Sequence, residues 1–240
     1  AVVIKHTNPC GLACAEDIYT AYIKARDADP VSAFGSVVGV NREVNEKLAK
    51  ELTSTFVEVI VAPSYSNSAF KNLSTRPNMR VLIWKGEEER WELRSVEGGI
   101  LLQEKDLKIE EPSDWRIVSR KEPTQEELED LFFAWRVVKH VKSNAIVVAK
   151  DKCTLGIGAG QMSRIDAVKI ALSKSRSSTQ GAVLASDAFF PFPDSIEEAA
   201  KAGITAIVEP GGAKRDEECI RTADEYGIAL IFTGKRHFRH

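Results

Sequence analysis

Short apolar runs alternate with amphipathic segments along the chain. The runs are rich in β-branched residues and predict strands at residues 1–4, 36–40, 57–62, 81–84 and 145–149. Apolar residues at helical spacing predict helices at residues 18–25, 43–52 and 124–138, and the last begins with a capping box of Thr124 and Glu127. Strands that alternate with helices predict an α/β fold with mostly parallel or mixed sheets.

The order of the predicted elements occurs twice. Residues 145–148 resemble residues 1–4, residues 206–210 resemble residues 59–63, and residues 229–232 resemble residues 81–84. A repeat this long indicates a duplicated α/β unit rather than a solenoid. We therefore expect one subdomain at residues 1–120, a connecting helical segment at 121–144 and a second subdomain at 145–240. Residues 85–111 mix charge with two glycines and are expected to run over the surface.

Composition narrows the class of protein. Hydrophobic residues make up 43% and charged residues 28%, and the net charge of −2 argues against a nucleic-acid partner. There is neither a signal-peptide pattern nor an apolar run of about 18 residues, so we expect no membrane partner. No metal-ligand spacing is visible among the histidines and cysteines, so we expect no zinc. The cysteines are expected to be reduced, mostly buried and cytoplasmic: Cys10, Cys14, Cys153 and Cys219.

Lys5 and His6 follow the first predicted strand, at the start of a polar loop that we expect to span residues 5–11. Open α/β sheets usually bind ligands just after a strand. A histidine beside a lysine supplies a proton acceptor and a cation. The alternative is a loop histidine bonded to backbone beside a solvated lysine.

Three later segments are further candidates. The glycines of residues 156–164 precede a helix and would let an anion approach its free amides, although a tight strand-to-helix turn explains them equally well. Residues 185–194 combine three phenylalanines with two prolines as a wall for a flat ligand, or simply as core, and Asp194 follows as a ligand contact or a helix cap. The basic tail at residues 235–240 contains Phe238, whose need for burial suggests that the tail docks.

Six motifs in one order carry a family resemblance. They are residues 5–11, 32–36, 142–147, 156–164, 186–192 and the ending from Arg236 to Phe238. Their series closely resembles the transformylase domain of the bifunctional purine biosynthesis proteins, the AICAR formyltransferase/IMP cyclohydrolase family (AICAR is 5-aminoimidazole-4-carboxamide ribonucleotide). The resemblance covers essentially the whole chain. It implies two cytidine-deaminase-like α-β-α subdomains without zinc, since the H-x-E and C-x-x-C motifs of the zinc deaminases are missing.

The resemblance also implies a reaction. A formyl group moves from 10-formyltetrahydrofolate, the co-substrate, to the 5-amino group of AICAR. His6 would accept the proton of the attacking amine, Lys5 would stabilise the transition state, and Asn144 would hold the reactants in register. The implied AICAR contacts are Ser64, Asn144, Arg164, Phe189 and Arg236. The implied folate contacts are Ile165, Asp194, Ala213 and Lys214.

The resemblance further implies a cytoplasmic homodimer, with the cyclohydrolase domain and an upstream part of the transformylase domain lying outside this sequence. Ser64 also stands where relatives often have a glycine near the nucleotide. Two alternatives to a formyltransferase stay open. One is a folate- or nucleotide-binding fragment without turnover, and the other is a zinc-free deaminase-like enzyme.

Overall fold

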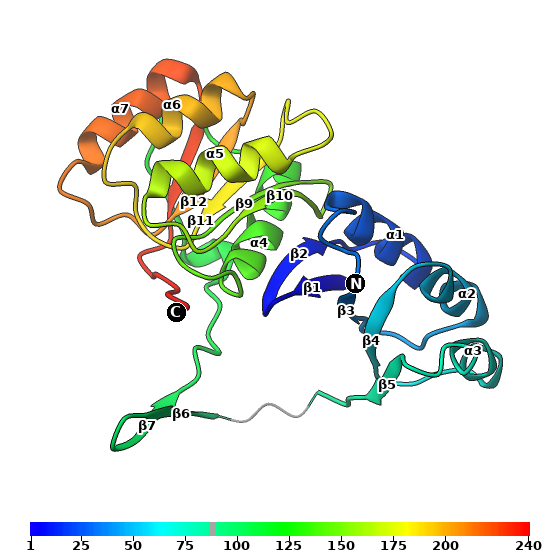
Figure 1. Cartoon of the computed structure of the whole chain (residues 1–240). Helices are drawn as coiled ribbons and strands as arrows, with labels where there is room; N and C mark the ends of the chain where they lie inside the picture. Colours follow the sequence, from blue (N-terminus) through cyan, green and yellow to red (C-terminus); the bar gives the residue numbers. More distant parts are fainter. Residues whose placement is uncertain (87–89) are drawn as a thin grey trace.

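The computed structural model describes residues 1–86 and 90–240. The described chain is a mixed α/β molecule with two large sheets and a separate hairpin (Figure 1). We call the sheet of β1–β5 with helices α1–α3 the first lobe, and the sheet of β8–β13 with helices α4–α7 the second lobe. Among the described residues, no helix has the length and apolar character needed to cross a membrane.

The first lobe has the strand order β2-β1-β3-β4-β5. Strand β1 is antiparallel to β2 and β3, whereas β3, β4 and β5 run parallel. Asp17, Asn45 and Ser66 cap helices that cover one face, each by accepting a backbone N–H. The elements are β1 (Val2–Lys5), β2 (Asn8–Leu12), α1 (Ile18–Ala28), β3 (Ser36–Gly39), α2 (Glu46–Ser54), β4 (Val57–Ala62), α3 (Asn67–Leu73) and β5 (Arg80–Ile83).

The second lobe has the order β10-β9-β11-β12-β13-β8. Its first five strands pair in the same senses as those of the first lobe, and β8 is added antiparallel at the edge. The elements are β8 (Arg116–Ile117), α4 (Gln125–Val138), β9 (Ile146–Lys150), β10 (Cys153–Gly158), α5 (Arg164–Lys174), β11 (Val183–Ser186), α6 (Asp194–Lys201), β12 (Ala206–Glu209), α7 (Asp216–Tyr226) and β13 (Ala229–Phe232).

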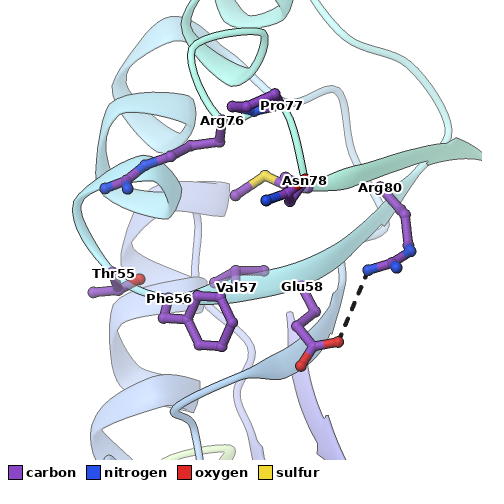
Figure 2. Close-up of a pocket in the computed structure, with 9 residues that line it drawn as sticks. Thr55, Phe56, Val57, Glu58, Arg76, Pro77, Asn78 and Arg80 are labelled. Atoms are coloured by element: carbon purple, nitrogen blue, oxygen red, sulfur yellow. Dashed lines mark ion pairs between the residues drawn. The ribbon is translucent and has the colours of Figure 1, made fainter.

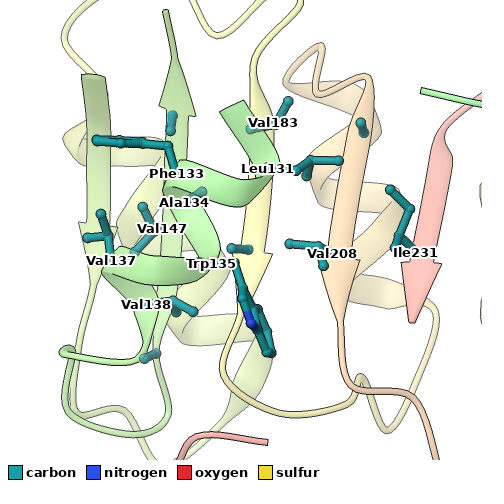
Figure 3. Packing of buried hydrophobic residues seen from close by; sticks show 14 of the residues in the cluster. Leu131, Phe133, Ala134, Trp135, Val137, Val138, Val147, Val183, Val208 and Ile231 are labelled. Carbon is teal, nitrogen blue, oxygen red and sulfur yellow. The ribbon is translucent and has the colours of Figure 1, made fainter. Parts of the chain in front are cut away.

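Helix α4 covers one face of the second sheet. Leu131 and Trp135 point from it onto strand residues such as Val208, and all three side chains are fully buried (Figure 3). Helices α5, α6 and α7 cover the opposite face. Because both faces are covered, the strands need apolar residues at nearly every position, which explains the unbroken apolar runs in this half of the sequence. The predicted capping box of Thr124 and Glu127 is confirmed.

One loop prediction needs correction. Residues 5–11 form a hairpin instead of a loop, with β2 starting at Asn8 and a two-residue turn at His6 and Thr7, whose φ angles are 49° and 65°. Of the expected mostly parallel or mixed sheets, both large sheets are mixed. The predicted surface excursion at 85–111 includes residues 87–89, which lie outside the described residues. Its described remainder contains a two-stranded hairpin, β6 (Trp91–Val96) and β7 (Gly99–Glu104), followed by the 3-10 turn η1 (Pro112–Asp114).

The prediction of mostly buried cysteines is also wrong. Only Cys219 is buried, whereas Cys10 and Cys153 are half-buried and Cys14 is exposed. Cys14 and Cys153 lie where the two lobes meet edge to edge. The Cys14 amide donates to the Lys152 carbonyl at 2.9 Å, and Cys153 forms an antiparallel bridge with Ala13. The Leu12 amide also donates to the Thr154 hydroxyl at 2.9 Å. The positions were misjudged because the contact between the lobes cannot be read from local spacing.

Candidate active site: a cleft in the second lobe

A cleft of about 430 Å³ lies at the carboxyl end of β11. Its walls come from the start of α5, the loop from β11 to α6, and the C-terminal tail. Six residues predicted for the site lie around it: Asn144, Arg164, Ile165, Phe189, Asp194 and Arg236. The other lining residues are Met162, Ser163, Ala188, Pro191, Phe192 and Phe238. Ligands of open α/β sheets commonly bind at this end of the strands.

A buried ion pair forms the floor of the cleft. Arg164, the first residue of α5, donates from Nη1 to the carboxylate of Asp187 and to the carbonyl of Ala145, the latter at 3.1 Å. Asp187 is fully buried and also accepts from the Ala145 amide at 3.0 Å and from the Ser143 hydroxyl. A guanidinium has five donors, so these bonds leave others for a ligand.

The same arginine orients Asn144. Its Nη2 donates to the side-chain oxygen of Asn144 at 2.6 Å. The Asn144 side-chain nitrogen donates to the carbonyls of Gln161 and Met162 at 2.9 and 3.1 Å. Arg164 and Asn144 are therefore held as one unit in the lining of the cleft, which preorganises both groups for a ligand.

The aromatic segment divides into core and wall. Phe190 is fully buried, whereas Phe189 is half-buried and Phe192 is 49% exposed. Asp194 is the first residue of α6, and its carboxylate accepts the Ser195 amide at 2.7 Å. This contact uses one carboxylate oxygen, and the other is left for a ligand. The N-cap of α6 is Pro193, so the helix-cap interpretation of Asp194 is wrong, and the ligand contact stays a prediction.

The C-terminal tail docks, but through His237 instead of Phe238. The imidazole is 3% exposed, and its Nδ1 lies 2.5 Å from Asp106 Oδ2. Its backbone amide donates to the Asp187 carbonyl at 3.1 Å. Phe238 is 50% exposed at the rim, where the Arg236 guanidinium lies 5.2 Å from its ring centroid. The expectation that Phe238 is buried is therefore wrong.

Lys5 and His6 lie outside the cleft lining, on the turn of the β1–β2 hairpin. The Lys5 ammonium donates to the carbonyls of Phe34 and Gly35 at 2.7 and 2.8 Å, and the His6 side chain is exposed. The hairpin nevertheless lies beside the second lobe, because Asn8 accepts the Lys142 amide at 2.9 Å. Lys142 is two residues before Asn144.

Three further predicted contacts lie elsewhere. Ser64 follows β4, and its hydroxyl donates to the Glu43 carboxylate at 3.3 Å. Ala213 and Lys214 precede α7, where the Ala213 amide donates to Asp216 at 2.9 Å. None of the three lines the cleft.

The glycines at 156 and 158 serve packing. Both lie in β10, and a Cβ added at either position would come within 2.0 Å of a carbonyl oxygen of α5, at Ala171 and Ala167. At the start of α5, the Ser163 hydroxyl accepts the Asp166 amide at 3.1 Å. The tight packing of β10 against α5 therefore explains Gly156 and Gly158, and an anion site at the start of α5 stays a prediction.

Sequence reasoning overlooked Asp187 and His237. Asp187 follows Ser186 at the end of the apolar residues 182–185, and a charged residue just after a buried strand is a usable signal. His237 gave no such signal, because its partners Asp106 and Glu110 are far away in the chain.

A separate pocket of about 380 Å³ lies in the first lobe, between the start of β4 and the segment from α3 to β5 (Figure 2). Arg80 and Glu58 face each other there at 3.9 Å. None of the predicted site residues lines this pocket. Within residues 1–86 and 90–240, no cluster of three or more His, Cys, Asp or Glu side chains is arranged to hold a metal ion.

The chain is thus a mixed α/β protein with a cleft at the end of a strand, a position where folds of this class commonly bind small molecules. The chain belongs to the family described as AICARFT/IMPCHase bienzyme, which residues 1–174 match.

Curated relatives agree with this family. The chain is 53% identical over 241 residues to a bifunctional purine biosynthesis protein PurH of Thermoanaerobacter sp.. It is 52% identical to the PurH of Bacillus cytotoxicus and 54% identical to that of Caldicellulosiruptor saccharolyticus, each over 242 residues. Each comparison covers 100% of this chain and 47% of the relative, so the chain spans about half the length of these proteins.

Among solved structures, the chain is similar to two crystal structures of dCMP deaminase from the cyanophage S-TIM5. The complex with dCMP and dUMP gives a TM-score of 0.30 at 18% identity, covering 36% of this chain and 77% of the deaminase. The apo form gives 0.32 at 17% identity, covering 45% and 98%. Similarities this low carry no argument about function.

Proposed function

We propose that this chain carries the formyl-transfer activity of its family: transfer of the formyl group of 10-formyltetrahydrofolate to the 5-amino group of AICAR. The observation that supports this most is the cleft, around which six of the residues implied by the family resemblance lie together. They come from positions as far apart as Asn144 and Arg236 in the sequence. The family membership supports the same reaction.

The chemistry requires a base and an oxyanion stabiliser. The 5-amino group of AICAR is a weak nucleophile because its lone pair is delocalised into the ring. His6 accepts the proton of this amine as it attacks the formyl carbon, and the Lys5 ammonium stabilises the negative charge on the formyl oxygen. Collapse of the tetrahedral intermediate expels the folate nitrogen, which takes up a proton. Asn144 aligns the two substrates.

Each substrate has its own group of contacts in this proposal. Arg164 and Arg236 bind anionic or carbonyl oxygens of AICAR, and Phe189 stacks on its ring. Ser64 is the remaining AICAR contact. The free oxygen of Asp194 accepts the N–H groups of the pterin, and Ile165 packs against it. Ala213 and Lys214 complete the folate contacts.

A homodimer would bring the two parts of the site together. Lys5 and His6 lie on the first lobe and outside the cleft, so the cleft of one copy needs a hairpin turn delivered to it. Apolar side chains on β6 and β7 support a second copy as partner, since Leu93, Ile100 and Leu102 are 68%, 69% and 60% exposed. We place this dimer in the cytoplasm, without nucleic-acid or membrane partners and without zinc.

The matching strand order of the lobes supports a duplicated, deaminase-like fold. The pairing of β1 with β3 corresponds to that of β9 with β11, both antiparallel. The turns at His6-Thr7 and Asp151-Lys152 also correspond, since all four residues have φ between 49° and 65°.

The test is formyl transfer from 10-formyltetrahydrofolate to AICAR by the wild type and by His6→Ala. Loss of a general base lowers turnover by about 10²–10⁴-fold, with little change in AICAR affinity. His240→Ala is the matched control, because His240 is also exposed and lies outside the cleft. Near-normal turnover of His6→Ala would contradict the role of His6.

A second candidate function is a nucleotide- and folate-binding half without turnover of its own. It is favoured by one observation, the 47% of the relatives' length that the chain spans. Assaying this chain beside the full-length polypeptide separates the two functions. Binding of both substrates by this chain, with turnover only by the longer polypeptide, would favour the second.

A further inference from the structure

Glu209 is a buried acid that the proposed reaction does not use. It is the last residue of β12, and its side chain is fully buried. One oxygen, Oε2, accepts the backbone N–H of Phe190 at 2.7 Å. The other, Oε1, has no hydrogen-bond partner among the described residues. A buried carboxylate with an unpaired oxygen is costly, so its retention calls for a reason.

The fold itself does not require an acid at this position. Strand register aligns β12 with β4, because Leu184 pairs with Ile207 as Val38 pairs with Ile60. Glu209 then corresponds to Ala62, and each is followed by a proline. Ala62 is equally buried, at 1% exposure. The strand therefore accommodates an apolar residue at this position. The carboxyl group of Glu209 is explained instead by its contact with the loop that follows β11.

Above Glu209 lies the loop that forms the aromatic wall of the cleft. The carboxyl group holds the Phe190 amide, and the neighbouring residues Phe189 and Pro191 line the cleft. Phe190 is held at a second point, since the Cys219 thiol donates to its carbonyl at 3.7 Å.

The charged surroundings favour the neutral acid. The groups on the elements around it are Arg164 on α5, Asp187 after β11, Asp194 on α6, and Asp216 and Cys219 on α7. Arg164 is the only cation of this set and is bonded to Asp187. Burial is the largest cause and raises the pKa of Glu209 to about 8. The charge of Asp216 acts in the same direction, whereas the Phe190 bond, the charge of Arg164 and the Gly211 backbone amide lower the pKa.

We propose that Glu209 is a positioning residue of the cleft, which as a neutral carboxylic acid fixes the Phe190 backbone and with it the aromatic wall. Ionisation strengthens the bond from the Phe190 amide itself, but it places a buried charge without a bonded cation beneath the wall, and the cost of burying that charge loosens the packing around it. The cleft is thus in its ordered form below about pH 8 and loses order above it.

The sign of the linked stability follows from the raised pKa. Between the ordinary value of 4.5 and about 8, the folded protein holds a proton that the unfolded chain has released. The stability that this group contributes is complete below pH 4.5. Between pH 4.5 and about pH 8, the folding equilibrium constant falls by up to tenfold for each pH unit. Glu209→Gln, which keeps the acceptor for Phe190 but cannot ionise, removes this dependence.

The test is NMR of protein labelled with ¹⁵N-phenylalanine, titrated from pH 5 to pH 9.5, on the wild type, Glu209→Gln, Glu209→Ala and the control Glu225→Gln. Glu225 lies on the exposed side of α7. We expect the Phe190 amide resonance to titrate with a midpoint near pH 8 in the wild type and the control, and to stay constant in Glu209→Gln. Faster hydrogen exchange at Phe190 is expected in Glu209→Ala.

A Phe190 resonance that does not titrate in the wild type, or titrates equally in Glu209→Gln, would overturn the proposal. If Glu209→Ala fails to fold, chemical denaturation of the wild type and Glu209→Gln between pH 5 and pH 8 still tests the proposal. Equal pH dependence of the free energy of unfolding in the two proteins would overturn the proposal.

A second arm rests on the proposed function and measures AICAR binding. Glu209→Gln should match the wild type within twofold at pH 6.5 and bind at least threefold more tightly at pH 9. No binding by any variant, with the NMR titration present, would reject AICAR but leave the role of Glu209 intact. If the wild type binds AICAR with the same affinity at pH 6.5 and pH 9, the proposal that Glu209 controls the order of the cleft would be rejected.

Discussion

The two lobes share a strand order but differ in how their sheets are covered. In the second lobe, β11, β12 and β13 are buried at every position, between α4 on one face and α5–α7 on the other. In the first lobe, β3 alternates between buried and half-buried positions, and Val3 is the one buried residue of β1. Their less buried face forms a groove of about 610 Å³ lined by residues that include Val2, Ile4, Val37 and Trp84.

The equivalent turns show the same difference. In the second lobe, the Asp130 carboxylate on α4 accepts the amides of Asp151 and Lys152 at 2.8 and 2.7 Å. In the first lobe, the corresponding turn presents His6 and Thr7 to solvent. The fully covered sheet therefore holds its turn and its cleft in fixed positions, whereas the half-covered sheet leaves its turn accessible, as the proposed role of His6 requires.

The largest stability effect is expected at Trp135, the central side chain of the α4 contact. Trp135→Ala removes a fully buried indole and should lower the free energy of unfolding by about 3–5 kcal/mol. Trp84→Ala is the matched control in the first lobe, where the indole is 57% exposed, and should change it by less than about 0.5 kcal/mol. Urea denaturation measures both. Equal effects would break the comparison between the lobes.

A closer comparison uses Val147 and Val2, which occupy equivalent registers in β9 and β1. Val147 pairs with Ile157 and Val2 with Leu12, but only Val147 is fully buried. Burial of a valine contributes about 1.5–3 kcal/mol, so Val147→Ala should cost about 2 kcal/mol. Val2→Ala should cost less than half as much. A larger loss at Val2 would indicate that the groove face is covered in solution.

The smallest effect sharpens the assignment of the cleft. Asp194→Asn replaces one acceptor by a donor, so one contact with the pterin becomes donor against donor. We expect folate affinity to fall about tenfold, the cost of one hydrogen bond to a charged group, while AICAR affinity stays within twofold. Isothermal titration with each substrate measures this. A greater loss of affinity for AICAR than for folate would contradict the assignment of Asp194 to the folate contacts.

The sequence predicted correctly the ends of elements that carry a capping residue or a proline. The capping box of Thr124 fixed the start of α4, and the proline after Ala62 fixed the end of β4. The β1–β2 hairpin was missed because turns with two positive φ angles usually contain asparagine or glycine, and this one is His6-Thr7.

The cleft shows the same limit. Its six residues were identified through the family resemblance, and their roles stay predictions. The ion pair that orders them joins Arg164 to Asp187, and the tail is anchored by His237 against Asp106. Both contacts arise only after distant segments have packed. Glycines 156 and 158 suggested an anion site for the same reason, since their close approach to α5 is a tertiary feature.

The central claim is that His6 of one copy acts in a cleft containing Arg236 of a second copy. The most direct measurement mixes the inactive variants His6→Ala and Arg236→Ala under conditions of subunit exchange and assays formyl transfer, using the full-length polypeptide if this chain alone lacks turnover. Equal amounts of the two variants exchange into dimers of which about half are mixed, and in a two-fold dimer with shared sites each mixed dimer has one intact site of two. About a quarter of all sites are then intact, so we expect recovery of about a quarter of wild-type activity. Activity no higher than the average of the separate variants would contradict the claim.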